Sequence, residues 1–140
     1  AVRHKDVIPW DDDADLSILM EDENKLLAIQ PNLYQMGYGV VPFWGGYKIF
    51  PVNGTEIKFY NRNWSWSESS KDIEDNETFE YKYPFIDIFL VQKENNEFHF
   101  ANPKVKRTWP TYYHEIEDLY PLKKYQFNNF TLVGPNNPIP

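Results

Sequence analysis

Four aspartates lie within five positions of the stretch VIPWDDDADLSIL, residues 7–19, with apolar residues on both sides of them. Side chains of a β-strand alternate between two faces, so Asp11, Asp13 and Asp15 share one face if this segment is extended. Same-face neighbours are about 6–7 Å apart at Cα, which allows two carboxylates to close on one ion. The spacing therefore predicts a cation site. Because Asp12 falls on the other face, we expect Asp12→Asn to be much milder than Asp13→Asn.

The donor atoms narrow the choice of cation. All-oxygen ligands favour Mg²⁺ or Mn²⁺, with Ca²⁺ next. An EF-hand calcium loop that started at Asp11 would need Gly at its sixth position and Glu at its twelfth. The sequence has Leu16 and Asp22 there. The pattern therefore disfavours an EF-hand and predicts Mg²⁺ or Mn²⁺.

One further acid stands out because it is the single charge in the apolar run PFIDIFLV. This acid is Asp87, and a lone carboxylate in a buried strand is costly unless it is paired or metal-bound. Two interpretations stay open: an ion pair with a Lys, Arg or His, or a position that faces the acid cluster from a neighbouring strand. Acids from two strands that grip Mg²⁺ are what metal-assisted phosphoryl transfer requires.

The composition limits the class of protein. The chain has 140 residues, so we expect one domain, residues 1–140. Aromatic residues make up 18% of it, which favours strands over helices. The net charge of -7 argues against nucleic acid as a partner, and no stretch is long and apolar enough for a membrane segment. The start AVRHKD has neither an initiator Met nor a signal-peptide core, so we interpret the domain as truncated at its N-terminus.

The elements that must position these acids follow from apolar patterning and turn residues. We expect a short helix over residues 21–30 that closes at Pro31. Turns are expected at Gly45–Gly46, at Asn53–Gly54 as a tight hairpin, and at residues 94–97. Residues 65–78 predict an exposed polar loop, and residues 112–119 a helix or loop. Strands are expected at residues 14–20, 38–44, 47–52, 56–60, 84–92, 98–101, 122–127 and 130–134. These elements predict an α+β fold with few short helices.

Three segments resemble one protein family. VRHKDVIPWDDDADLSI resembles the first signature of the LicD, fukutin and fukutin-related protein family, and YPFIDIF resembles its second. The closing segment, residues 118–138, is similar to that of the family, so the resemblance spans nearly the whole chain. It implies a nucleotidyltransferase-like mixed β-sheet and a divalent metal. It also implies transfer of a phosphorylated alcohol, such as phosphocholine or ribitol phosphate, from a CDP-alcohol donor to a glycan or glycoprotein acceptor.

The resemblance also assigns residues. It implies that Asp11, Asp13, Asp15 and Asp87 are the catalytic and metal-binding acids, and that Arg3 contacts donor phosphate. The family's glycine-containing segment upstream of VRHKD is absent from this chain, which fits a truncated start.

Two other cations are candidates on their own residue type. Lys48 and Arg107 could hold phosphate or the acceptor, and the alternative for each is an ordinary solvated cation. Aromatic residues beside Arg in RTWPTYY could stack sugars or bases, or pack in the core. His99 and His114 show no spacing of a metal triad.

Four Asn-x-Ser/Thr triplets, at Asn53, Asn63, Asn76 and Asn129, are more than this composition gives by chance. They predict a glycoprotein of the secretory pathway, in the Golgi lumen, with an Asn-rich cytoplasmic protein as the alternative. Two other functions stay open. One is an Asp-x-Asp glycosyltransferase that uses a nucleotide-sugar, and the other is a non-catalytic module that binds Ca²⁺ or carbohydrate.

Overall fold

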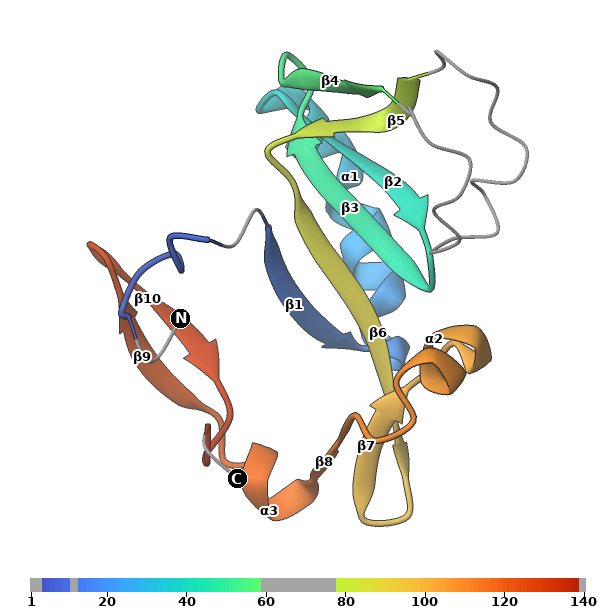
Figure 1. The fold of residues 1–140 in the computed structure, drawn as a ribbon, viewed down its shortest axis with the longest axis vertical. Coiled ribbons are helices and arrows are strands. Elements are labelled where there is room, and N and C mark those ends of the chain that lie inside the picture. The colour runs from blue at the N-terminus through green and yellow to red at the C-terminus, as the bar shows by residue number, and fades with distance from the viewer. Residues whose placement is uncertain (1–3, 11–12, 59–77, 139–140) are drawn as a thin grey trace.

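The most apolar run of the sequence forms the central strand of the main sheet, β6 (Ile86–Glu94). The computed structural model of the chain describes residues 4–10, 13–58 and 78–138. Strand β1 (Ala14–Leu19) runs parallel to β6, whereas β3 (Gly46–Pro51) and β7 (Glu97–Phe100) run antiparallel to it (Figure 1). Because β6 is long, its first half pairs with β3 and its second half with β7, while β1 occupies the other edge.

The remaining described elements are short and complete an α+β fold with a mixed sheet, which confirms the predicted fold class. Strands β2 and β8 extend the main sheet at its two ends, and β4 with β5 and β9 with β10 form two separate ladders. In chain order these elements are the 3-10 turn Met20–Asp22, α1 (Glu23–Gln35), β2 (Tyr38–Phe43), β4 (Thr55–Lys58), β5 (Thr78–Tyr83), α2 (Pro103–Thr108), β8 (Tyr113–Glu115), α3 (Ile116–Leu119), β9 (Lys123–Phe127) and β10 (Phe130–Gly134).

Helix α1 corrects one prediction. It continues through Pro31 to Gln35, whereas the sequence predicts its end at Pro31. A proline inside a helix removes one hydrogen bond and costs about 3 kcal/mol. Here the turn after Pro31 still closes, since the Met36 N–H donates to the carbonyls of Asn32 and Leu33. The helix ends instead at Gln35, and Gly37 follows the C-cap Met36 with a φ of 92°, in the left-handed region.

The prediction of a tight hairpin at Asn53–Gly54 is wrong. The Gly54 N–H donates to the Pro51 carbonyl at 2.9 Å, so the turn is present and has Val52 and Asn53 at its centre. However, β4 pairs with β5 and not with β3. A two-residue hairpin of the favoured type needs positive φ at both central residues, and neither of these two has it.

The β2–β3 hairpin does have such a turn. Its central residues are Trp44 and Gly45, with φ values of 36° and 79°, one position before the predicted Gly45–Gly46 pair. The β6–β7 hairpin lies where the sequence predicts its turn, and β9 and β10 match the strands predicted at residues 122–127 and 130–134. The predicted helix or loop over residues 112–119 is strand β8 followed by α3. Most of the predicted polar loop lies outside the described residues; its last residue, Thr78, begins β5.

The core lies where α2 packs on the sheet. Val91, Phe100 and Val105 form a buried cluster, and Val105 is only 1% exposed. The Asn102 side chain caps α2 by accepting from two backbone N–H groups, and Pro103 follows at the first helical position. Partly buried residues packed on this cluster are Leu19, Trp44, Phe89 and Trp109.

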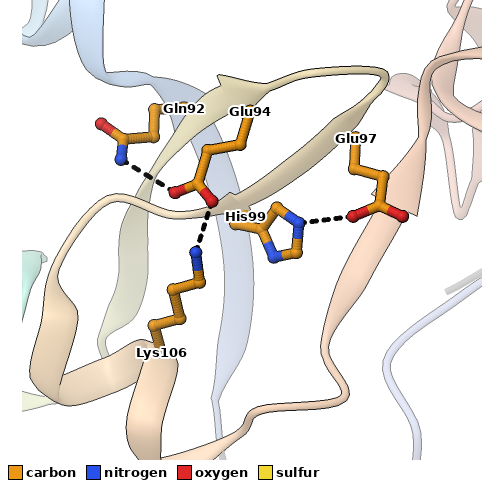
Figure 2. Close-up of polar contacts among 5 residues, drawn as sticks. All are labelled: Gln92, Glu94, Glu97, His99 and Lys106. Atoms are coloured by element: carbon orange, nitrogen blue, oxygen red, sulfur yellow. Dashed lines mark hydrogen bonds and ion pairs between the residues drawn. The ribbon is translucent and has the colours of Figure 1, made fainter.

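A surface network ties α2 to the β6–β7 hairpin (Figure 2). The Lys106 Nζ of α2 donates to the carboxylate of Glu94 at 2.5 Å, and Gln92 donates to the same carboxylate at 3.1 Å. Beside them, His99 Nε2 lies 2.7 Å from Glu97 Oε2.

None of the helices in the described parts of the chain is long and apolar enough to cross a membrane.

Candidate metal centre

Three adjacent strands place one charged residue each at the same level of the sheet. Asp15 of β1 is the register partner of Asp87 of β6, and Asp87 is in turn the partner of Lys48 of β3. Register partners point to the same face. The neighbouring Tyr47 points to the opposite face, where its hydroxyl donates to Glu23 of α1 at 2.5 Å. Helix α1 therefore covers one face of the sheet, and the charged row lies on the other.

Asp13, at the entry to β1, joins this row. One carboxylate oxygen from each of Asp13, Asp15 and Asp87 can be chosen so that all three lie within 4.8 Å of one another. Strand parity predicts that Asp13 and Asp15 share a face, and the apolar run predicts an acid opposite them; the structure agrees with both. Three hard oxygen ligands from two strands fit Mg²⁺ or Mn²⁺, because a divalent cation offsets the repulsion among the carboxylates.

The predicted residues Arg3, Asp11 and Asp12 lie outside the described residues. Their assignments, and the milder effect expected for Asp12→Asn, stay predictions.

Lys48 is buried, which the solvated-cation alternative did not anticipate. The residue is 4% exposed, and its Nζ donates to Asp87 Oδ1 at 2.5 Å. Both interpretations of Asp87 are therefore correct, because the residue pairs with a lysine and also faces the acid cluster. The ammonium lies 3.8 Å from the ring centroid of Phe85 and 4.6 Å from those of Phe43 and Tyr81. A direct phosphate contact by Lys48 stays a prediction.

A cavity of about 580 Å³ opens beside the acids. The three acids and Ser17 supply its polar side, and aromatic residues from β2, β6, β7 and the segment after α2 form much of its wall. The lining residues are Asp13, Asp15, Ser17, Phe43, Trp44, Tyr47, Asp87, Ile88, Phe89, Phe100, Trp109, Thr111 and Tyr112. Within that wall Trp44 and Trp109 meet edge to face at 4.8 Å, and Tyr112 stacks on Phe100 at 4.4 Å.

The tyrosines around the acids respond to burial and negative charge. Burial, and then the nearby charge of Asp87, raises the pKa of Tyr81 to about 12. Burial also raises the pKa of Tyr112, a hydrogen bond with Ser17 lowers it, and the charge of Asp15 raises it further. Both phenols therefore stay neutral at physiological pH.

Arg107 is exposed on α2, and the described residues that line the cavity do not include it. Its role as a phosphate or acceptor contact stays a prediction. Ser17, Trp44 and Tyr47 line the cavity but were not singled out from the sequence. Ser17 could have been identified from the sequence, because it lies on the same strand face as Asp13 and Asp15.

Comparison with known proteins decides the family. The family model described as the LicD/FKTN/FKRP nucleotidyltransferase domain matches residues 1–137. The chain belongs to this family. Membership confirms the resemblance seen in the motifs, and the matched domain is of a transferase family. LicD-family proteins are typically metal-dependent, in agreement with the acid cluster.

Two curated relatives of this LicD-family chain are uncharacterized proteins from Rickettsia. The relative from Rickettsia prowazekii is 33% identical over 139 residues, which is 99% of the chain and 40% of that protein. The relative from Rickettsia typhi is 31% identical over 140 residues, or 34% of that protein. The chain thus spans well under half the length of these relatives. Rickettsia have no Golgi, so the relatives give the predicted Golgi location no support.

Proposed function

We propose that this LicD-family domain is a divalent-metal-dependent phosphotransferase. It moves a phosphorylated alcohol from a CDP-activated donor to a hydroxyl group of a glycan. One observation carries the proposal: Asp13, Asp15 and Asp87 come together from two strands beside a cavity of about 580 Å³. Acids in this arrangement can hold the metal of a phosphoryl-transfer site, and the cavity provides room for a nucleotide donor.

The reaction is a substitution at phosphorus. The acceptor oxygen forms a bond to the phosphorus that carries the alcohol, the pyrophosphate bond of the donor breaks, and CMP leaves. The acceptor hydroxyl loses its proton, so the products are the phosphodiester on the glycan, CMP and one released proton. A bound Mg²⁺ or Mn²⁺ would neutralise the charge on the phosphates and stabilise the leaving group.

The protein's own residues contribute position and environment. The three acids supply the ligands, and the antiparallel partner β3 holds Asp87 through Lys48. Trp44, Trp109 and Tyr112 shield one side of the cavity from water and offer ring faces to a planar base or a sugar. Substrate positioning and electrostatic stabilisation account for most of the catalysis in phosphoryl transfer.

The test is a screen of the protein, expressed at the length of its natural gene, against CDP-choline, CDP-ribitol and CDP-glycerol. CMP release is measured with Mg²⁺ and with a chelator. We expect release from at least one donor in Mg²⁺ only, and a loss of about 100-fold or more in Asp13→Ala and Asp15→Ala. Undiminished release in either variant contradicts the proposal.

The same screen separates the two alternatives left by the sequence. Turnover of UDP- or GDP-sugars, without turnover of CDP-alcohols, indicates a glycosyltransferase. Binding of glycan with a clear preference for Ca²⁺ and no turnover of any donor indicates a binding module.

A further inference from the structure

Lys48 occupies an unusual environment for a lysine. Its side chain is 5% exposed, and that of Asp87, the acid to which it donates, is 18% exposed. A buried ammonium is costly unless an opposite charge and favourable contacts compensate it. Lys48 has both, because Asp87 supplies the charge and the rings of Phe43, Tyr81 and Phe85 surround the ammonium.

The rings also restrain Lys48. Phe43 meets Tyr81 edge to face at 5.1 Å, and Tyr81 meets Phe85 in the same way at 5.1 Å. The three rings thus form a connected box, and Lys48 enters it from the middle of strand β3. An ammonium enclosed in this way stays next to Asp87 and cannot swing into solvent as a surface lysine does.

The charges of the site give Lys48 a role. Asp13, Asp15 and Asp87 place three carboxylates close together, and their mutual repulsion disfavours the folded state when no cation is bound. The Lys48 ammonium offsets part of this repulsion. A divalent ion bound by the same carboxylates would meet a like charge on the far side of Asp87, which weakens its binding.

We propose that Lys48 is a built-in counter-ion and positioning residue of the metal centre. It keeps the acid cluster folded without metal and lowers the affinity of the cluster for a divalent cation. The inference rests on the metal site of the proposed function and concerns its regulation: the ion binds reversibly, and folding does not depend on it.

The test compares Lys48→Met with the wild-type protein by thermal unfolding, in EDTA and in saturating Mn²⁺. Methionine keeps the apolar chain length and removes the charge. We expect a lower Tm for the variant in EDTA, a larger rise in Tm on adding Mn²⁺ than in the wild type, and at least about tenfold tighter Mn²⁺ binding by calorimetry. Lys93→Met, an exposed lysine on β6, is the matched control and should behave as the wild type does.

Each outcome decides the proposal. A Lys48→Met protein that is unfolded in EDTA and folded in Mn²⁺ is the strongest form of the expected result. Three results overturn the proposal. They are a rise in Tm on adding Mn²⁺ that is equal or smaller in the variant than in the wild type, no rise in Tm in either protein, and a variant that is unfolded in both conditions.

A double-mutant cycle adds a second readout. In EDTA, Asp87→Asn should restore Tm to the Lys48→Met protein, because it removes the carboxylate that has lost its partner. A further loss of Tm contradicts the counter-ion role. Neither measurement uses turnover, so a protein without transferase activity can still support this inference while the proposed function fails.

Discussion

Asp15 and Asp87 face each other across two parallel strands as register partners, and both carboxylates join that of Asp13 within 4.8 Å. The two residues are 72 positions apart in the chain, so the β1–β6 ladder creates the site. A change that disturbs the pairing of β6 should therefore affect the acids without altering them.

Gly46→Ala tests the pairing of β6 with β3. A Cβ at this position would lie 1.8 Å from the Ile88 carbonyl oxygen, so the strands must separate. We expect a loss of about 3 kcal/mol in the free energy of unfolding. Mn²⁺ binding should also weaken, because β6 carries Asp87 and a shift of this strand moves that ligand away from Asp13 and Asp15. Chemical denaturation and calorimetry measure the two effects.

Gly37→Ala is the control for that variant. Its Cβ would meet open space. The loss in the free energy of unfolding is therefore only that of placing an alanine at a φ of 92°, about 1–2 kcal/mol. Mn²⁺ affinity should not change in the control. Equal stability losses at the two glycines would show that the close approach of β3 and β6 is unimportant.

Tyr112→Ala tests the aromatic wall of the cavity. Stacking of a base on an aromatic ring contributes about 1–3 kcal/mol, so we expect KM for the nucleotide donor to rise about tenfold. Tyr112→Phe keeps the ring and should keep the wild-type KM. Steady-state kinetics measure both, with Tyr34→Ala on α1 as a control on the opposite face. An unchanged KM in Tyr112→Ala would place the donor elsewhere.

The Lys106–Glu94 pair of Figure 2 predicts a pH dependence of stability. Lys106, and then Gln92, lowers the pKa of Glu94 below its usual 4.5. A lowered folded-state pKa stabilises the protein above the unfolded value, and the contribution is lost as the pH falls through the folded value. Lys106→Met should therefore lower Tm slightly at pH 7, and the difference from wild type should shrink below pH 4.5.

Thermal unfolding across this pH range is the measurement. Lys124→Met, an exposed lysine on β9, is the control. A difference between wild type and Lys106→Met that grows on acidification would contradict the sign of this prediction.

Strand parity predicts that Asp13 and Asp15 share a face, and the single charge in an apolar run offers Asp87 as an acid that could face them. Both patterns are local in the sequence. The parallel pairing of β1 with β6 then places Asp15 beside Asp87 in the sheet. Strand parity does not, however, predict which residue forms an ion pair with Asp87. The sequence left open which cation pairs with Asp87, although Lys48 stands in a strand almost as apolar as β6.

Turn and helix boundaries were harder to predict, because tertiary contacts override local preference. Pro31 stays inside α1, where the following turn closes around it, and Asn53–Gly54 lies in a turn that leaves the main sheet. Helix α2 was not predicted, although Asn102 followed by Pro103 is a helix-start signal. Six residues are too few for a periodic apolar pattern to be visible.

The proposed function depends most on Asp13, Asp15 and Asp87 holding one divalent cation. Calorimetric titration of Mn²⁺ into wild type, Asp15→Asn, Asp87→Asn and Asp22→Asn tests this directly, since Asp22 pairs with Lys25 at the start of α1 instead. We predict binding by wild type and Asp22→Asn, and affinity reduced at least about tenfold in the other two variants. Unchanged affinity in Asp15→Asn or Asp87→Asn would contradict the account.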